Sequence, residues 1–534
     1  MSDVGSLART TTAPADEPGP APERPSLVLL TLILVASVAN LPLAVANVAL
    51  PDIGRHFDAS QTQLNLVAVA YSLGLAASVL WFGAIADHRG RKQTLLVGVV
   101  LSVPACLVAA WAPSVEVLVG ARIVGGLAAG MAYPTTLSLI TALWSGEGRT
   151  RAIALWSATG GGLMALGPLA AGLVLSRFWW GSVFLLTLPL VVVAVVMTVR
   201  FVPSHVNETA ERVDGLGGLI SVILVGSGIV AINFAPVPEK GTLALVLGLV
   251  AVGALVVFGA RERRVANPLF DLAVAGRRIF WVAATAGMIV FGSLMGAMFV
   301  GQQYLQNVLG YSTVDAGLSL LPAAAVMVLI APHSARLIEA RGARVTLLVG
   351  YVLILLGFVT MFAFWREHTS FWSIAAAYIL IGAGVGFAGT PASHSLTGSV
   401  PVHRAGMASG TADLQRDLGG AVMQSILGAL LTAGYTAATR AAIAASPQSA
   451  QVTANVESEL TKSYSSASNL AGQYPADADQ IIAGAKDSFI HGQHWAYGAG
   501  MVAVGLGGVL VYALFPRRDD ERRLLADYHR ADER

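Results

Sequence analysis

Gly83-Ala84-Ile85-Ala86-Asp87-His88-Arg89-Gly90-Arg91-Lys92 lies between two long apolar runs and carries an acid, three fixed positive charges and two glycines. Gly90 permits a tight turn that a residue with a Cβ would resist. Fixed charges are costly in hydrocarbon and gather on the cytoplasmic side of membrane proteins. The stretch therefore predicts two membrane-spanning helices joined by a short basic turn in the cytoplasm.

The same stretch is repeated 252 residues later in the chain. Arg89-Gly90-Arg91-Lys92-Gln93-Thr94-Leu95-Leu96-Val97-Gly98 returns as Arg341-Gly342-Ala343-Arg344-Val345-Thr346-Leu347-Leu348-Val349-Gly350, and Glu339 takes the place of Asp87. Parallel repeats of this kind suit alternating access around a central site. We therefore expect two similar helical halves.

The composition identifies the class of protein. Of 534 residues, 55% are hydrophobic and 12% are charged, whereas a soluble protein carries about 25% charged residues. Many continuous apolar runs reach the ~18–20 residues that a spanning helix needs, and continuous runs argue against a barrel. Cys106 is the only cysteine, so neither a disulfide nor a cysteine metal site is expected. The expected fold class is an all-α polytopic membrane protein.

We expect fourteen spans, with five regions along the chain. The spans are placed near residues 27–50, 64–87, 93–112, 116–140, 150–175, 181–203, 216–236, 241–261, 279–304, 314–336, 345–365, 369–393, 405–434 and 494–515. The regions are a disordered cytoplasmic tail at 1–26, a six-helix bundle at 27–203, an inserted helix hairpin at 204–265, a second six-helix bundle at 266–515 and a cytoplasmic tail at 516–534.

The positive charges agree with this topology, which leaves both termini in the cytoplasm. Of the 33 lysines and arginines, 24 fall on the expected cytoplasmic side and 7 on the outer side, as the positive-inside rule requires. The second bundle includes a polar outer loop at 436–493. Two interpretations of this loop remain open, a mobile loop and a lid over an exit path.

Two aspartates are the strongest candidates for chemistry within the membrane. Asp413 and Asp417 lie about 14–20 Å into the thirteenth span at ~1.5 Å per residue, and their i,i+4 spacing places both carboxylates on one helical face. Ionisable groups at such a depth are expensive and are functional candidates by default. One interpretation is proton coupling, with Arg416 as a modulating neighbour. The other is a static aspartate–arginine network.

Other polar residues are candidates for the lining of a central cavity. Asn40, Asn47, Gln302 and Gln306 are neutral amides in or near central spans, which suits an uncharged or amphipathic substrate. Arg122 also falls inside a span. Its permanently charged guanidinium can donate hydrogen bonds to backbone carbonyls or influence a neighbouring ionisable group, and both roles remain open.

These motifs together resemble the major facilitator superfamily, specifically its fourteen-helix drug:proton antiporters, from about residue 27 to 515. The segment from Gly83 to Lys92 is similar to the signature loop after the second helix. Arg122-Ile123-Val124-Gly125-Gly126-Leu127-Ala128-Ala129-Gly130 resembles the fourth-helix motif, and Leu166-Gly167-Pro168-Leu169-Ala170-Ala171-Gly172 resembles the fifth-helix antiporter motif.

The resemblance implies two six-helix bundles with an inserted two-helix hairpin, and it assigns roles to individual residues. Those implied for proton coupling are Asp413, Asp417, Arg122 and Arg416. A cytoplasmic gate is implied at Asp87, Arg91, Gly83 and Gly90. Gly167, Pro168 and Gly172 would pack or bend the fifth helix.

The first two helices depart from the family pattern. The acid and the threonine that usually precede Asn47 are replaced by Pro42 and Ala44, and Val69 and Ala70 precede Tyr71 where some relatives carry an acid. The acids most often associated with cationic drugs are therefore absent at these positions. This departure favours a dedicated exporter of a cell-envelope lipid or secreted metabolite as the main alternative.

The predicted function is secondary active transport, most simply proton-coupled efflux of drugs or amphipathic compounds. A non-transporting membrane sensor or scaffold is the second alternative. The sequence lacks the Gly-x4-Gly-Lys-Ser/Thr pattern of a phosphate-binding loop, so no enzyme and no ATP-driven pump is expected. We expect a multi-pass monomer in the inner (plasma) membrane, with a small-molecule substrate and protons as partners and no cofactor, metal or nucleic acid.

Overall fold

The computed structural model describes residues 24–144, 152–153, 155–156, 166–204, 213–237, 240–266, 268–400, 405–446 and 452–532. Within these ranges every regular element is a helix. Thirteen helices of the described chain are long and apolar enough to cross a membrane, and the shorter helix Leu166–Leu175 belongs to the expected fifth span. The all-α membrane fold is confirmed. The expected N-terminal tail and most of the first part of the fifth span lie outside the described residues.

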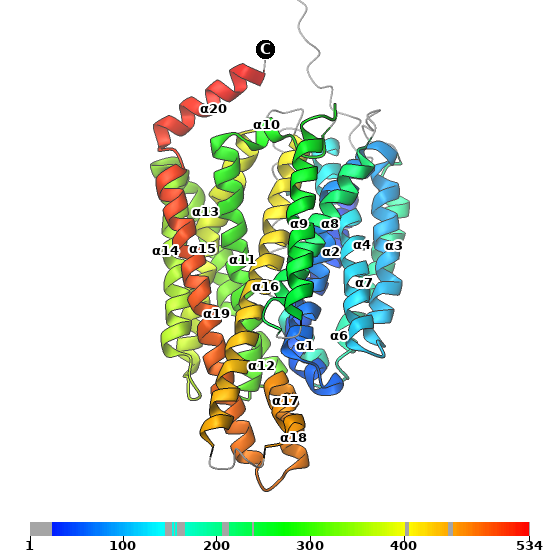
Figure 1. Cartoon of the computed structure of the whole chain (residues 1–534). Coiled ribbons are helices and arrows are strands. Elements are labelled where there is room, and N and C mark those ends of the chain that lie inside the picture. Colours follow the sequence, from blue (N-terminus) through cyan, green and yellow to red (C-terminus); the bar gives the residue numbers. More distant parts are fainter. Residues whose placement is uncertain are drawn as a thin grey trace, which may run out of the picture.

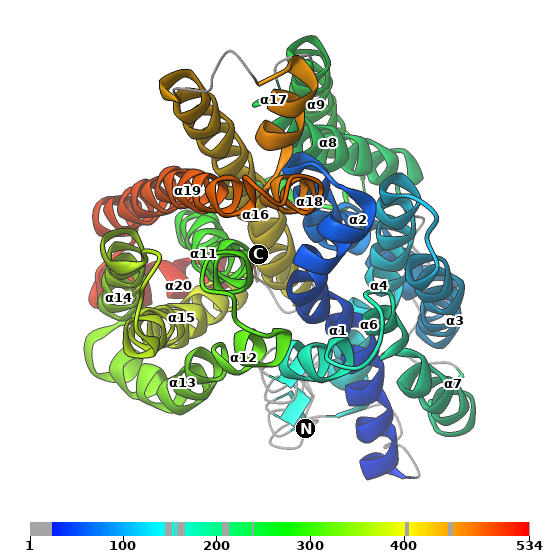
Figure 2. The same ribbon diagram turned by 90° about the horizontal axis from the view of Figure 1, so that it is seen from below.

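The helices form two halves side by side, which we call the N-half and the C-half (Figures 1 and 2). The N-half contains α1 (Pro25–Phe57), α2 (Gln61–Arg89), α3 (Arg91–Ala110), α4 (Val115–Leu143), the helix Leu166–Leu175, α6 (Ser182–Leu185) and α7 (Leu188–Phe201). The C-half contains α10 (Leu272–Ala275), α11 (Arg278–Asn307), α12 (Thr313–Leu318), α13 (Leu321–Arg341), α14 (Ala343–Phe364), α15 (Phe371–Gly398), α16 (Ala405–Ala445), α17 (Ala454–Lys462), α18 (Tyr464–Gln473), α19 (Ala478–Leu514) and α20 (Arg518–Asp532).

The two copies of the internal sequence repeat form turns of similar backbone geometry. Gly90 joins α2 to α3 with φ 112°, and Gly342 joins α13 to α14 with φ 87°. A side chain would be strained at either position. Thr94 and Thr346 each donate a hydroxyl hydrogen bond of 3.1 Å to the carbonyl of the glycine four residues earlier. The two basic turns are therefore built in the same way.

The repeat extends to the last helix of each half. Lys92 Nζ donates to the carbonyls of Val199 at 3.0 Å and Val202 at 2.7 Å, where α7 ends. Arg344, 252 residues after Lys92, donates to the carbonyl of Tyr512 near the end of α19. A cation at the C-terminal carbonyls of a helix is favourable. A basic side chain at the start of α3 thus bonds to the C-terminal end of α7, and one at the start of α14 bonds to the C-terminal end of α19.

The inserted hairpin consists of α8 (Gly215–Phe234) and α9 (Gly241–Glu262). Helix α8 packs against α2 and α16, whereas α9 contacts mainly α8 and is almost wholly exposed, as a lipid-facing helix would be. The side chain of Asp214 accepts two hydrogen bonds of 2.7 Å from the guanidinium of Arg261 and one of 3.0 Å from the backbone of Gly217. These bonds fasten the base of the hairpin.

The bundle has two ends, which we name the terminal end and the α17–α18 end. The terminal end carries the start of α1 and the C-terminal helix α20, at the top of Figure 1. In the expected C-terminal tail, α20 lies across the terminal end of the C-half (Figure 1). Its Asp532 pairs with Arg277, and its Glu521 accepts a hydrogen bond of 3.0 Å from Ser395. The opposite end, the α17–α18 end, carries the turn between α1 and α2.

The expected polar outer loop is more regular than an open loop. Helix α16 continues to Ala445, α17 and α18 follow, and α19 begins at Ala478 instead of near residue 494. Polar N-caps explain the short helices, because Thr453 accepts from the backbone of Val456 and Ser463 from that of Ser466. Together α17 and α18, which we call the cap, lie at the α17–α18 end beside α16 and α19 and next to the end of α1 (Figures 1 and 2).

Candidate functional site

The two deep aspartates lie on α16, where it faces the N-half. Arg416 donates to Asp413 Oδ1 at 3.0 Å and, through its other terminal nitrogen, to the hydroxyl of Tyr133 on α4 at 2.8 Å. Its guanidinium carbon also lies 5.9 Å from the ring centroid of Phe291 on α11. Arg416 therefore connects one acid of the C-half to a tyrosine of the N-half.

Asp417 lies one turn further along the same face of α16. The exposed fraction is 2% for Asp413 and 5% for Asp417, and Oδ2 of each is buried without a hydrogen-bond partner among the described residues. A buried carboxylate oxygen without a donor is costly when it is charged. These two oxygens are therefore suited to binding a proton that they can later release.

The neighbouring helices show the depth of this pair. Gly292 lies midway along α11, and a Cβ on Gly292 would come 2.5 Å from the carbonyl oxygen of Gly419. On the other side of α16, a Cβ on Gly428 would come 2.7 Å from the side chain of Asn65 on α2, and one on Gly410 would be in ordinary contact with Leu80 at 3.5 Å. Asp417, between these contacts, is thus close to mid-height in the bundle.

Arg122 is buried inside the N-half and is 3% exposed. Its Nε donates to the carbonyl of Val67 at 2.6 Å, and its terminal nitrogens donate to those of Pro42 at 3.4 Å and Ala68 at 3.5 Å. This arrangement corresponds to the structural alternative of a donor to backbone carbonyls that join α4 to α1 and α2. A part for Arg122 in proton coupling remains a prediction.

The fifth-helix motif lies where the two halves meet. A Cβ on Gly172 would collide with the carbonyl of Thr313 on α12, and one on Gly317 would come 2.7 Å from the carbonyl of Pro168. The hydroxyl of Thr313 donates to the carbonyl of Gly172 at 3.1 Å. Small residues on both helices permit this close approach, and Gly167 is buried beside it. The structure therefore places Gly167, Pro168 and Gly172 at packed positions against α12.

The expected gate lies at the terminal end. Gly90 forms the turn, a Cβ on Gly83 would meet nothing within 4 Å, and Arg91 donates to the carbonyl of Ser138 at 3.4 Å. The side chain of Asp87 lies outside the described part of the chain. The proposed Asp87–Arg91 gate therefore remains a prediction.

The four amides expected to line a cavity have other partners or are buried. Asn40 donates to Ala36 of its own helix at 3.0 Å, and Asn47 is 2% exposed. Gln302 donates to the carbonyl of Ala316 at 2.8 Å, and Gln306 to that of Val48 at 3.0 Å. Gln306 thus joins α11 to α1 near the α17–α18 end, and contact of these amides with a substrate remains a prediction.

Further hydrogen bonds join the halves at the α17–α18 end. Gln61 on α2 donates to Gln303 on α11 at 3.0 Å, and Asn65 on α2 donates to Thr432 on α16 at 3.1 Å. Together with the bond from Gln306, they form a layer of amides just inside the cap. The described contacts thus close this end of the molecule.

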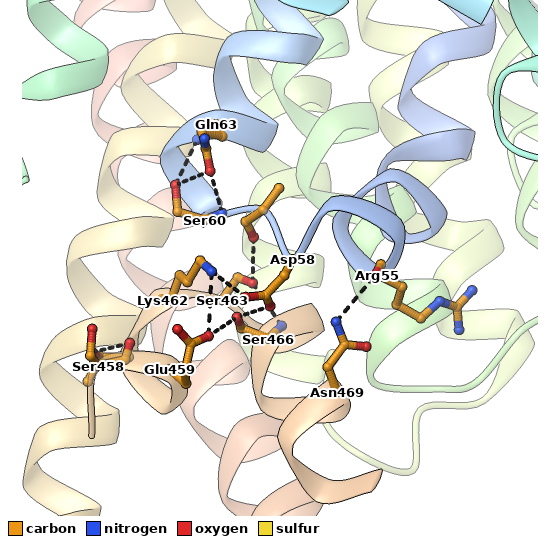
Figure 3. A network of polar contacts seen from close by, with 12 residues as sticks. Arg55, Asp58, Ser60, Gln63, Ser458, Glu459, Lys462, Ser463, Ser466 and Asn469 are labelled. Carbon is orange, nitrogen blue, oxygen red and sulfur yellow. Dashed lines mark hydrogen bonds and ion pairs between the residues drawn. The ribbon is translucent and has the colours of Figure 1, made fainter. Parts of the chain in front are cut away.

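The cap adds a second set of bonds, which we call the polar latch (Figure 3). Asp58 ends α1 in the left-handed conformation, with φ 50°, which aspartate tolerates better than most residues. Its carboxylate accepts hydrogen bonds from Lys462 and Ser466 of the cap. Ser463 donates to the carbonyl of Ala59 at 2.8 Å, and Asn469 to that of Arg55 at 3.1 Å.

The latch is electrostatically favourable. Burial raises the pKa of Asp58, but the hydrogen bonds from Lys462 and Ser466 and the charge of Lys462 outweigh this effect, and the pKa lies below its usual value. The Glu459 carboxylate lies beside the same two donors, 2.8 Å from Ser466 Oγ and 3.4 Å from Lys462 Nζ, so it shares the single hydroxyl proton of Ser466 with Asp58. The cap of the C-half is therefore held on the α1–α2 turn of the N-half by the charge of Lys462, which pairs with both Asp58 and Glu459.

The sequence model of the Major Facilitator Superfamily matches residues 32–424 of this chain. The chain belongs to the Major Facilitator Superfamily. Its predicted resemblance to the drug exporters of this superfamily is confirmed, and so is the prediction of a secondary transporter rather than an enzyme.

Two relatives in the superfamily cover most of the chain. It is 32% identical over 414 residues to the multidrug resistance protein Stp of Mycobacterium tuberculosis, and the match covers 77% of each chain. It is 31% identical over 471 residues to the multidrug efflux pump LfrA of Mycolicibacterium smegmatis, covering 87% of this chain and 90% of LfrA.

Solved structures of transporters agree with the fold. A bacterial homologue of the human lysosomal transporter Spinster, in an inward-facing and unoccupied conformation, superposes with a TM-score of 0.61 at 16% identity, over 94% of this chain and 98% of that one. A peptide transporter, POT, in complex with sulfate gives 0.58 at 13% identity, over 86% and 95%. At these identities the likeness concerns the fold alone.

Sequence reasoning missed two parts of the site. Tyr133 is 283 residues from Arg416, and no local pattern relates the two. The latch residues Asp58, Lys462 and Ser466 are similarly distant. One feature of the sequence could have drawn attention to the latch. Lys462 is one of only four lysines in the chain, and it follows Glu459 by three residues.

Proposed function

We propose that this superfamily member exports drugs or other amphipathic small molecules in exchange for protons, with Asp413 and Asp417 as the proton-binding groups. The observation that carries the proposal is the pair of buried carboxylate oxygens on one face of α16 at mid-height, each without a hydrogen-bond donor among the described residues. Arg416 gives the two acids different surroundings, because it donates to Oδ1 of Asp413, whereas the Asp417 carboxylate accepts no hydrogen bond among the described residues.

The proposed orientation places the terminal end in the cytoplasm. Arg89, Arg91 and Lys92 lie at this end, and so does Arg344 in the repeated turn. Cytoplasmic loops of membrane proteins carry such an excess of positive charge. The α17–α18 end then faces outward, and the transporter is a multi-pass protein of the inner membrane that acts as a monomer.

In this orientation the described contacts correspond to a state closed toward the outside. The amide layer and the latch hold the halves together at the outer end. Substrate enters from the cytoplasmic side and reaches the region of Tyr133 and Arg416. Proton binding at Asp417 then removes a buried charge and shifts the balance between the two arrangements, as a ligand that prefers one state does.

The substrate class rests on two observations. The relatives Stp and LfrA are named for multidrug resistance and multidrug efflux. In this chain Pro42 and Ala44 occupy positions where cation exporters of the family carry an acid and a threonine. This difference favours uncharged or amphipathic compounds, and it keeps a dedicated exporter of an envelope lipid or secreted metabolite as the second candidate.

The test is efflux in cells that lack their own pumps. Accumulation of a panel of amphipathic fluorescent dyes is measured with and without a protonophore, for the wild type and for Asp413→Asn, Asp417→Asn and the double variant. Asp520→Asn, on the exposed surface of α20, is the matched control. The protonophore and the double variant should both abolish efflux at unchanged membrane expression. Persistent efflux by the double variant would exclude these acids as the coupling groups.

A further inference from the structure

A cavity of about 390 Å³ lies inside the cap, away from the deep aspartates. It lies between the outer parts of α16 and α19 and the short helices α17 and α18, and it is partly open to the surroundings. Its volume falls within the range of ~300–1,000 Å³ typical of small-molecule sites. The helices that form it all belong to the C-half, so the cavity does not depend on how the two halves are arranged.

The walls of the cavity are mainly apolar. Ile443, Val456, Leu460, Leu470 and Ile481 line it, each from an aliphatic side chain. Asp477, also among the lining residues, is exposed at the rim. Asp477 is the one charged side chain among the lining residues, and the inner wall around Ile443, Leu460 and Leu470 carries no charge, so a ligand seated against this inner wall is uncharged.

The buried hydroxyl of Ser488 in this wall has no hydrogen-bond partner among the described residues. Ser488 of α19 is 1% exposed and lines the cavity, and its hydroxyl makes no hydrogen bond to any described residue. By contrast, Thr439 on the facing wall donates to the carbonyl of Tyr435 at 2.9 Å, and Tyr435 itself donates to that of Leu460 at 3.1 Å. Buried hydroxyls are normally hydrogen-bonded, so Ser488 offers a bond to a ligand.

We propose that this cavity binds an uncharged amphipathic small molecule, with its apolar body against the aliphatic walls and a hydroxyl group hydrogen-bonded to Ser488. The occupant is a free molecule and not the acyl chain of a bilayer lipid, because the cap lies beyond the apolar spans and its rim is polar.

The cavity and the latch share the same two short helices. Leu460 and Leu470 face the cavity, whereas Lys462 and Ser466 bond to Asp58 of the N-half (Figure 3). A ligand that supports α17 and α18 from within therefore acts on the elements that close the α17–α18 end. The binding itself requires neither a gradient nor proton exchange.

The experiment is photolabelling of the full-length purified transporter in lipid nanodiscs, without any gradient. The probe is a long-chain alcohol that carries a diazirine, and labelled peptides are identified by mass spectrometry. Wild type should be labelled within residues 474–488, and an excess of unlabelled alcohol should suppress the labelling. Ala485→Phe fills the cavity from a residue that is 4% exposed and should abolish it. Ala483→Phe, on the exposed side of the same helix, should not.

A second variant tests the polar contact without a large side chain. Ser488→Ala should raise the alcohol concentration for half-maximal labelling roughly 2- to 10-fold, the worth of one hydrogen bond. A diazirine alkane of equal length should be unaffected by the same substitution. Labelling that survives Ala485→Phe would overturn the proposal, and so would labelling by a diazirine phospholipid in the nanodisc but not by the free alcohol. Because no transport is measured, these outcomes are independent of the proposed proton exchange.

Discussion

Arg416 on α16 and Tyr133 on α4 join the two halves of the transporter at mid-depth, with a hydrogen bond of 2.8 Å and the guanidinium 5.8 Å from the tyrosine ring centroid. The same guanidinium donates to Asp413 at 3.0 Å. A movement of one half against the other must change this three-residue contact. It therefore links the position of the halves to the surroundings of a proposed proton-binding acid.

Removal of the Tyr133 hydroxyl should weaken the closed arrangement. Tyr133→Phe keeps the ring but loses a hydrogen bond to a charged donor, which contributes roughly 1.5–3 kcal/mol. The separation of spin labels placed across the halves at the α17–α18 end should then shift toward longer distances. Tyr528→Phe, in α20, is the control. An unchanged distance distribution in Tyr133→Phe would show that this bond does not hold the halves.

The two aspartates should differ in what they contribute to stability. Asp413→Asn removes the negative partner of Arg416 and should lower the free energy of unfolding by roughly 1–3 kcal/mol. Asp417→Asn removes a buried charge whose Oδ2 has no donor among the described residues, and should leave stability equal or higher. Thermal unfolding of the purified variants in detergent measures the difference. Equal destabilisation by both would contradict the asymmetry seen around Arg416.

A covalent bond across the latch should stop transport. A Cβ added to Gly54 would lie 2.9 Å from Cβ of Ser465. The two Cβ atoms of a disulfide are ~3.5–4.5 Å apart, so a small outward shift of the backbone permits a disulfide at these two positions. Gly54→Cys with Ser465→Cys, in a Cys106→Ser background, should lose dye efflux under oxidation and regain it with a reductant. Each single cysteine variant is the control. Transport by the fully oxidised double variant would mean that the latch does not open during the cycle.

The latch should respond to acid in a defined direction. The pKa of Asp58 is held below its usual value in the folded protein, so its contribution is fully present above the unfolded pKa of ~3.9 and is lost as pH falls through the lower folded pKa. Spin labels across the latch should keep a constant separation from pH 8 down to about pH 5 and move apart only below about pH 4. Asp58→Asn should show the longer separation at every pH, and an opening near pH 6 in the wild type would point to another group.

The membrane core of this fold could be predicted because its signal is local. Apolar runs locate the spans, and the repeated turn at Gly90 and Gly342 indicates two similar halves. The cap could not be predicted in detail, since α17 and α18 are short and polar and the outer part of α16 continues beyond the apolar run. The contact between Tyr133 and Arg416 depends on how two bundles dock, which no pattern within either helix records.

Helix α16 is 41 residues long, or about 60 Å at ~1.5 Å per residue, roughly twice the ~30 Å of bilayer hydrocarbon. It carries Asp413 and Asp417 at one depth and, far beyond them, one wall of the cap. Close packing at Gly419 against Met288 and Gly292 of α11 fixes the helix near the acids, so a tilt of α16 about this point moves its outer end farther than the acids. A small tilt that follows proton binding at Asp413 or Asp417 would therefore displace the outer end of α16 by a larger distance. A molecule bound in the cavity contacts this outer end directly.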